Sequence, residues 1–97
     1  MATRFLECAA PISATLNLQI VPRILLEQAT MNATAIAASS AAISANNCRC
    51  VCVQSDEQIF VKIGPPGTNA TPASYRLAAG SEQYFECGIG DIISIRT

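Results

Sequence analysis

The sequence predicts a small all-β fold, an antiparallel sandwich or barrel with an extended N-terminal segment. The chain has 97 residues, which leaves room for one domain, because domains commonly run to about 100–150 residues. From residue 48 onward, short apolar or alternating runs follow one another with turn residues between them. Several short strands with turn signals about every 8–12 residues are typical of sandwiches and barrels.

The N-terminal third has one clear strand signal. Leu16, Leu18 and Ile20 occupy every second position of residues 14–21, so this stretch is predicted to be a strand with one apolar face. Pro22 ends it, because proline cannot donate a backbone hydrogen bond to a neighbouring strand.

Two stretches that follow are ambiguous. Residues 23–31 suit a short helix or a strand, and both alternatives stay open. Residues 32–47 are rich in Ala and Ser, and alanine favours helix. Ile36 and Ile43 lie seven positions apart, which fits one face of a helix. The residues alone therefore favour a weak helix, with a bulged edge strand as the alternative.

The strand pattern becomes regular at Cys48–Gln54. Alternation places the three cysteines of this run on one face of a strand. Ile59–Ile63 is a second strand, and the four residues 55–58 read as the turn of a β-hairpin between the two. The remaining segments are predicted to be a Pro/Gly-rich loop followed by three strands, over 64–73, 74–78, 82–87 and 92–96.

These elements divide the chain into an N-terminal extension, residues 1–31, and a β domain, residues 32–97. The extension could serve as an arm that lies on a neighbouring subunit, where strand addition would satisfy its backbone. Alternatively, it supplies the first strands of its own domain.

The five cysteines are predicted to be small apolar core residues. Alternate residues on one strand lie about 6.5–7 Å apart, at or beyond the limit for an unstrained disulfide. Thiols along one strand also diverge, whereas zinc needs four converging ligands. We therefore expect no metal site, and synthesis in a reducing cytoplasm.

No residue pattern indicates catalysis or a cofactor. The chain has no histidine, which removes the commonest general base and metal ligand. The acidic pairs Asp56–Glu57 and Glu82/Glu86 are expected to be solvated surface charges. Residues 64–67 (GPPG) lack the lysine and the following helix of a phosphate-binding loop. We predict that the protein is not an enzyme and has no catalytic or cofactor-binding residues.

The composition indicates association with protein partners. Apolar residues make up 51% of the chain and charged residues 13%, about half the usual ~25%. Low charge and a net charge of −1 favour assembly. The six basic residues are scattered, which argues against nucleic acid. No apolar run is long enough to span a membrane, and Glu7 interrupts the stretch where a signal peptide would be apolar.

Three of the five aromatic residues, Tyr75, Tyr84 and Phe85, lie on neighbouring predicted strands. We expect them to be core or interface anchors, with a sugar-binding platform as the alternative. Together with Leu16, Leu18 and Ile20 of the extension, they form the candidate interface.

Residues 59–97 resemble a pattern found in small virion proteins of tailed phages. In that pattern a Gly-terminated strand precedes a Pro/Thr/Ala loop, a short strand with leucine, an Ala-Gly turn, Glu-x-Tyr-Phe, and a Gly-Asp turn into a closing strand. These elements are Phe60–Gly64, Pro65–Ala73, Ser74–Leu77, Ala78–Gly80, Glu82 with Tyr84 and Phe85, and Gly90–Asp91 with Ile92–Ile95. Residues 33–44 and the CRCVCV run also resemble the first two strands of that group, which favours strand over helix there. Residues 1–31 depart from the pattern.

The resemblance implies a phage structural protein located in the virion. We expect a decoration or cement protein that binds the major capsid protein on the capsid surface and assembles as a homo-oligomer, with a trimer favoured. Burial of apolar area between capsomers would then stabilise the shell. A head–tail connector or tail protein is the nearest alternative, and a carbohydrate- or receptor-binding β module is the alternative from another class.

Overall fold

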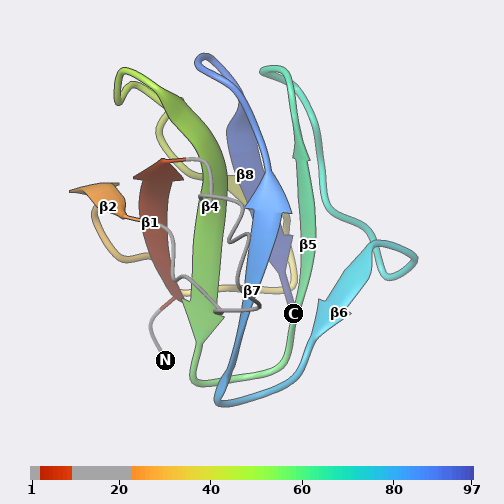
Figure 1. Ribbon diagram of the computed structural model, residues 1–97. Coiled ribbons are helices and arrows are strands. Elements are labelled where there is room, and N and C mark those ends of the chain that lie inside the picture. Colours follow the sequence, from red (N-terminus) through yellow and green to blue (C-terminus); the bar gives the residue numbers. More distant parts are fainter. Residues whose placement is uncertain (1–2, 10–22) are drawn as a thin grey trace.

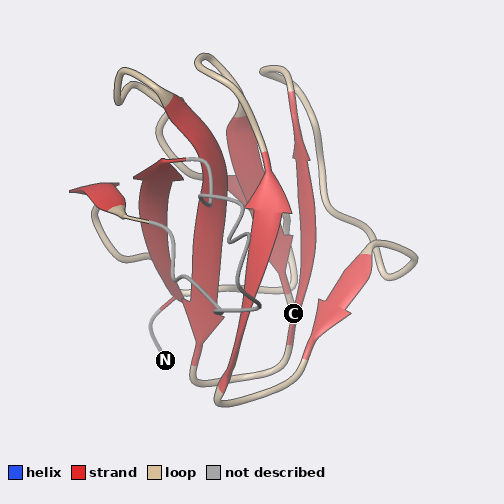
Figure 2. Cartoon of the chain, viewed as in Figure 1, coloured by secondary structure: helices blue, strands red, loops and turns tan. Residues whose placement is uncertain are grey.

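Two antiparallel four-stranded sheets pack face to face in the computed structural model, which describes residues 3–9 and 23–97 (Figure 1). None of the described residues is helical (Figure 2). The all-β sandwich predicted from the sequence is therefore confirmed. The strands are β1 (Thr3–Ala9), β2 (Ile24–Glu27), β3 (Ala38–Ser39), β4 (Cys48–Ser55), β5 (Ile59–Gly64), β6 (Tyr75–Leu77), β7 (Ser81–Glu86) and β8 (Ile92–Arg96).

Sheet A has the strand order β2-β1-β4-β7. Its strand β1 pairs with β4 along its whole length, from Thr3 opposite Ser55 to Ala9 opposite Cys48. Residues 3–9 and 24–27 thus supply strands of the chain's own sandwich, which was one of the two alternatives for the N-terminal third. Sheet A runs across the boundary expected at residue 31. The strand predicted over 14–21 lies outside the described residues.

Sheet B has the order β3-β8-β5-β6, which makes the predicted hairpin of β4 with β5 wrong. The two strands lie in opposite sheets, and only Asp56, Glu57 and Gln58 connect them. Three extended residues reach about 10 Å, which is the usual spacing of packed sheets. A turn of this length therefore suits a crossing between sheets as well as a hairpin, and alternation in the sequence cannot distinguish the two.

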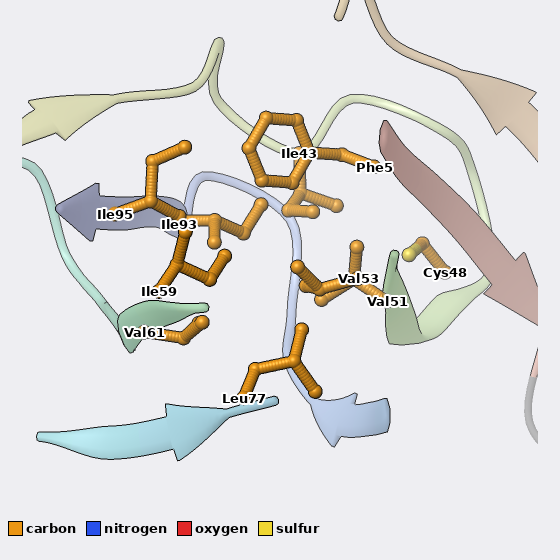
Figure 3. Close-up of a cluster of buried hydrophobic side chains, with 10 residues drawn as sticks. All are labelled: Phe5, Ile43, Cys48, Val51, Val53, Ile59, Val61, Leu77, Ile93 and Ile95. Carbon is orange, nitrogen blue, oxygen red and sulfur yellow. The ribbon is translucent and has the colours of Figure 1, made fainter. Parts of the chain in front are cut away.

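Ten buried residues from both sheets and from the segment before β4 form the core between the sheets (Figure 3). They are Phe5, Ile43, Cys48, Val51, Val53, Ile59, Val61, Leu77, Ile93 and Ile95. Burying a large aliphatic or aromatic side chain contributes about 1.5–3 kcal/mol each. Burial of this cluster is therefore the main contribution to the free energy that holds the two sheets together.

The Ala/Ser-rich stretch forms neither the helix that its residues favour nor the full strand that the resemblance implies. Only Ala38–Ser39 is a strand, paired with β8. Ser40 continues this contact, since its amide donates to Ile93 O (2.8 Å) and its hydroxyl accepts from Ile93 N (3.0 Å). Ile43 is 1% exposed and Ile36 is 79% exposed, so their spacing does not put them on one buried face. Backbone contacts with β8 override the local helix propensity.

A fully buried carboxyl group fixes the segment that follows. Glu7 of β1 is 0% exposed, and one of its oxygens accepts hydrogen bonds from the amides of Ser44 and Ala45, both at 2.9 Å. Its other oxygen accepts from Gln28 Nε2 at 3.0 Å. Because a buried carboxyl group needs such partners, Glu7 positions the segment that carries Ile43 into the core.

Candidate interaction surface

Among the strands of residues 3–9 and 23–97, β7 is the longest that lies at a sheet edge. On one side, β7 pairs with β4, from Glu86 opposite Cys50 to Ser81 opposite Ser55. No described strand pairs with its other side. The other edges offer less backbone: β3 has two residues, β6 has three, and β2 has four with a register shift opposite Glu7/Cys8. Bulges and short strands protect an edge from pairing, so β7 is the edge best suited to accept another strand.

The three aromatic residues predicted as anchors gather around this edge from both faces. Tyr84 lies opposite Cys52, on the face of sheet A that points away from sheet B. Phe85 lies opposite Val51 and packs partly buried against the core. Tyr75, on β6 of sheet B, meets Phe85 edge to face, with ring centroids 5.2 Å apart and an interplanar angle of 87°. The two sheets therefore meet at this side of the sandwich through one aromatic pair.

Exposure separates the roles of these residues. Tyr75 is 49% exposed and Tyr84 is 37% exposed, so both rings can contact a partner. Phe85 is half-buried and holds Tyr75 in place. Leu16, Leu18 and Ile20, the other candidate interface residues, lie outside the described residues.

A polar row crosses the outer face of sheet A beside Tyr84. The guanidinium of Arg4 contacts Glu27 Oε1 at 2.9 Å and Gln54 Oε1 at 3.2 Å. Gln54 Nε2 in turn donates to Glu82 Oε2 at 2.7 Å. The row thus links all four strands of the sheet, and it leads to β7. These contacts also show that Glu82 is partnered at the protein surface.

An open pocket of about 480 Å³ lies beside this polar row, whose residues Arg4, Gln54 and Glu82 also line the pocket. None of the residues that line it is aromatic; they are Arg4, Thr30, Gln54, Ser55, Asp56, Gly80, Ser81 and Glu82. Tyr75 and Tyr84 both lie outside this pocket, so the aromatic residues and the pocket are separate features of the surface.

The cysteines lie on two faces of sheet A, so their predicted alignment on one face is wrong. Cys50 and Cys52 join Leu6 and Cys8 in a second buried cluster on the outer face. Cys48 belongs to the core between the sheets. A register shift causes the difference, since Cys8 pairs with Cys50 while the next residue, Ala9, pairs with Cys48, and a bulge reorients the strand locally.

The prediction that these cysteines are core residues is confirmed for Cys8, Cys48, Cys50 and Cys52, which are all buried. Burial raises the pKa of Cys8 to about 11, with a further contribution from Cys50. Burial and the nearby Glu82 raise the pKa of Cys52 to about 11. Both thiols are therefore protonated at neutral pH. Within residues 3–9 and 23–97, no three acidic, cysteine or histidine side chains are arranged to bind a metal ion.

Several exposed apolar side chains were not predicted to be exposed. They are Ile24 and Leu26 of β2, Ile36, and Ile89 in the turn before β8. The exposure of Ile24 and Leu26 depends on β2 lying at a sheet edge, and alternation does not report that. None of the described segments is a helix of the length and apolarity required to cross a membrane.

Comparisons of this chain with models of protein families, with curated proteins and with solved structures found no match.

Proposed function

We propose that this protein is a non-enzymatic structural subunit of a tailed-phage virion, which decorates the capsid and cements neighbouring capsomers by binding the major capsid protein. The resemblance of residues 59–97 to small phage virion proteins supports the phage setting. The low charge of the chain, 13% of residues, supports a surface that partners cover. The capsid surface is then the site of action, after synthesis in the host cytoplasm.

The outer edge of β7, with which no strand among residues 3–9 and 23–97 pairs, is the observation that carries this proposal. A partner strand added to it would form main-chain hydrogen bonds, and flanking pockets would provide specificity. Tyr84 would contact the partner on one face, and Tyr75 on the other. Aromatic side chains are enriched among the residues that dominate binding energy, so the two tyrosines are suited to anchor the contact.

The charges on β7 favour a different protein over a second copy as the partner. If two β7 strands paired antiparallel about Tyr84, Glu82 of each would face Glu86 of the other. Like charges directly opposite each other destabilise a strand pair. A capsid-protein segment with basic side chains would instead complement both carboxyl groups. Self-association, with a trimer as the expected form, would then use another surface.

The mechanism is the burial of apolar surface at an interface, and it involves no chemical reaction. Stable interfaces bury about 800 Å² per partner, and apolar area contributes about 25 cal/mol per Å² before the costs of association are subtracted. A subunit bound across two capsomers opposes their separation by the free energy of that contact. Decorated shells should therefore withstand heat and internal pressure better than bare shells.

The first test is the copy number of this protein relative to the major capsid protein in purified particles, measured by quantitative mass spectrometry. A value near one copy per capsid subunit, or a simple fraction of it, is expected. A ring of about six to twelve copies would favour the head–tail connector or tail instead, because such positions have closed cyclic symmetry. Complete absence from particles would overturn the virion assignment.

The second test locates the contact. Purified protein is titrated onto bare capsid shells, and the bound fraction is measured by cosedimentation. Tyr84→Lys and Tyr75→Lys are each expected to weaken binding at least about fivefold, as for interface residues that contribute more than about 1 kcal/mol. Ile24→Lys is the matched control, since it places the same charge on an exposed residue at the opposite edge of sheet A. Equal losses for all three variants would contradict the assignment of the β7 edge.

A further inference from the structure

We propose that Cys48 and Cys87 are a covalent modification site, where a reversible disulfide forms between β4 and the end of β7. Their sulfur atoms lie 3.9 Å apart, within contact distance of each other. A disulfide requires about 2.05 Å, so the two atoms must approach by a further ~1.9 Å. The inference is independent of the role proposed for the virion.

The surroundings allow this small movement. Cys87 directly follows β7, and its amide donates to Arg49 O at 3.0 Å, which keeps it next to β4. Gly88 follows it, and a Cβ added there would meet no atom within 4 Å. Cys87 therefore lies where a strand passes into an open turn, and its side chain packs partly buried against the core, next to Cys48. Cys48 is held at the margin of the core (Figure 3).

The two thiols differ in exposure in the way that stepwise exchange requires. Cys87 is half-buried, whereas Cys48 is 1% exposed. A small disulfide such as oxidised glutathione can therefore reach Cys87 first. The Cys87 thiolate attacks one glutathione sulfur and expels one glutathione thiolate, which leaves a mixed disulfide on Cys87. Cys48 then attacks the Cys87 sulfur and expels the second glutathione.

The exchange balances without another reactant. Two protein thiols are oxidised to one disulfide, and one glutathione disulfide is reduced to two thiols, which receive both protons. The rate of the first exchange step is limited by the fraction of Cys87 that is present as thiolate. Burial, followed by the neighbouring Cys48, raises the pKa of Cys87 to about 12, and Cys50 and Asp91 also raise it. Because the thiolate is scarce at pH 7, exchange should accelerate about tenfold per pH unit between pH 7 and 9.

The competing pair is Cys8 with Cys50, which are direct cross-strand partners. Both are buried, so neither is open to the first attack by a dissolved disulfide. Cys8, Cys50 and Cys48 each donate a hydrogen bond from Sγ to a backbone carbonyl, at 3.2, 3.5 and 3.3 Å, so these hydrogen bonds do not separate the pairs. The greater exposure of Cys87 favours Cys48–Cys87 as the pair that oxidises in the folded protein.

Peptide mapping identifies the pair directly, because trypsin separates the relevant cysteines. Peptides 24–49 and 77–96 each carry one cysteine, Cys48 and Cys87 respectively, while Cys8 falls in 5–23 and the remaining two in 50–62. The folded full-length protein is incubated with oxidised glutathione at pH 8.5, free thiols are blocked, and the digest is analysed without reduction. A mass loss of about 2 Da and a crosslink between 24–49 and 77–96, removed by dithiothreitol, are expected.

Variants connect the crosslink to stability. The bridge would join residues 39 positions apart, and closing such a loop should raise Tm by roughly 5 °C or more. Cys87→Ser should lose both the crosslink and the Tm shift, whereas Cys52→Ser, the matched control on β4, should keep both. A Cys8–Cys50 crosslink, a stable glutathione adduct on Cys87 without closure, or no mass change would each overturn the proposal. The mapping uses the unchanged protein, so it does not depend on whether a variant folds.

Discussion

Both faces of sheet A bury a cluster of side chains, but the two clusters are built from different residues. The inner face presents large side chains such as Phe5 and Val53 to the other sheet. The outer face buries the smaller set Leu6, Cys8, Cys50 and Cys52, and a polar row and Tyr84 flank it. On β1 the adjacent residues Phe5 and Leu6 belong to different clusters. Burial alone therefore does not identify which residues hold the two sheets together.

The largest expected effect on the free energy of unfolding comes from substituting these two neighbours on β1, Phe5 and Leu6. Phe5→Ala should lower the free energy of unfolding by about 3–5 kcal/mol, because it leaves a cavity between the sheets. Leu6→Ala should cost less, about 2 kcal/mol, at the lower end for buried leucines, because its cluster has only four buried members. Urea unfolding under reducing conditions measures both. An equal or larger loss for Leu6→Ala would mean that the outer cluster contributes as much stability as the core.

A second variant tests the buried carboxyl group on the inner face. Glu7→Gln keeps the shape of the side chain but replaces one acceptor oxygen with an amide that faces donors. Hydrogen bonds to charged groups contribute about 1.5–3 kcal/mol, so a loss of about 2–3 kcal/mol is expected in urea unfolding.

Glu86→Gln is its matched control. Glu86 is exposed on β7, and surface substitutions usually change stability by less than about 0.5 kcal/mol. If both variants were equally stable, the contacts of Glu7 with Ser44 and Ala45 would not be what fixes that segment.

A third prediction uses the thiols of the outer face. Their pKa values in the folded protein, about 11 for Cys8 and Cys52, lie above the ordinary value of 9.0. Above pH 9 the unfolded chain releases these protons while the folded chain retains them. Stability contributed by the thiols is therefore complete below pH 9 and is lost as the pH rises towards 11. Each thiol adds a slope of at most about 1.4 kcal/mol per pH unit.

Urea unfolding between pH 7 and 11, with a reductant present, measures this slope. Cys52→Ala removes one of the two thiols, so its stability should fall less steeply above pH 9 than that of the unchanged protein. Parallel pH profiles for the two proteins would show that Cys52 does not titrate as its burial predicts.

The smallest expected effect on the free energy of unfolding comes from breaking the polar row. Arg4 and Glu27 are each about half exposed, at 48% and 47%, and exposed ion pairs typically contribute about 0.2–1 kcal/mol. Arg4→Ala should therefore change the free energy of unfolding by less than about 1 kcal/mol, and by still less at 1 M salt. A loss comparable to that of Leu6→Ala would instead show that the row stabilises the outer face.

Some elements could be predicted from the chain and others could not, for identifiable reasons. The runs that became β4, β5, β7 and β8 were visible because apolar alternation reports a strand directly. Strand β1 was not predicted, because Thr3–Ala9 carries only a weak strand signal. The apolar residues of this segment do not alternate strictly, since Phe5 and Leu6 are both buried on opposite faces.

The candidate interface could be predicted only in part. Tyr75, Tyr84 and Phe85 were selected for their rarity and proximity in sequence, and they do surround one edge. That Phe85 supports Tyr75 while Tyr84 faces the other side depends on β6 and β7 lying in different sheets. The contact of Cys48 with Cys87 depends on a bulge, and nothing in CRCVCV distinguishes its first cysteine from the other two.

Composition and alternation are local properties, and they were sufficient for the all-β class, for most strand positions and for the expectation that the thiols are buried. Strand pairing, sheet membership and the bulge at Cys48 required the folded structure. Each of these depends on contacts between residues far apart in the chain, such as Glu7 with Ser44 or Ser40 with Ile93. A strand has the same alternation whichever neighbour it pairs with, so only the packing of the whole chain selects the partner.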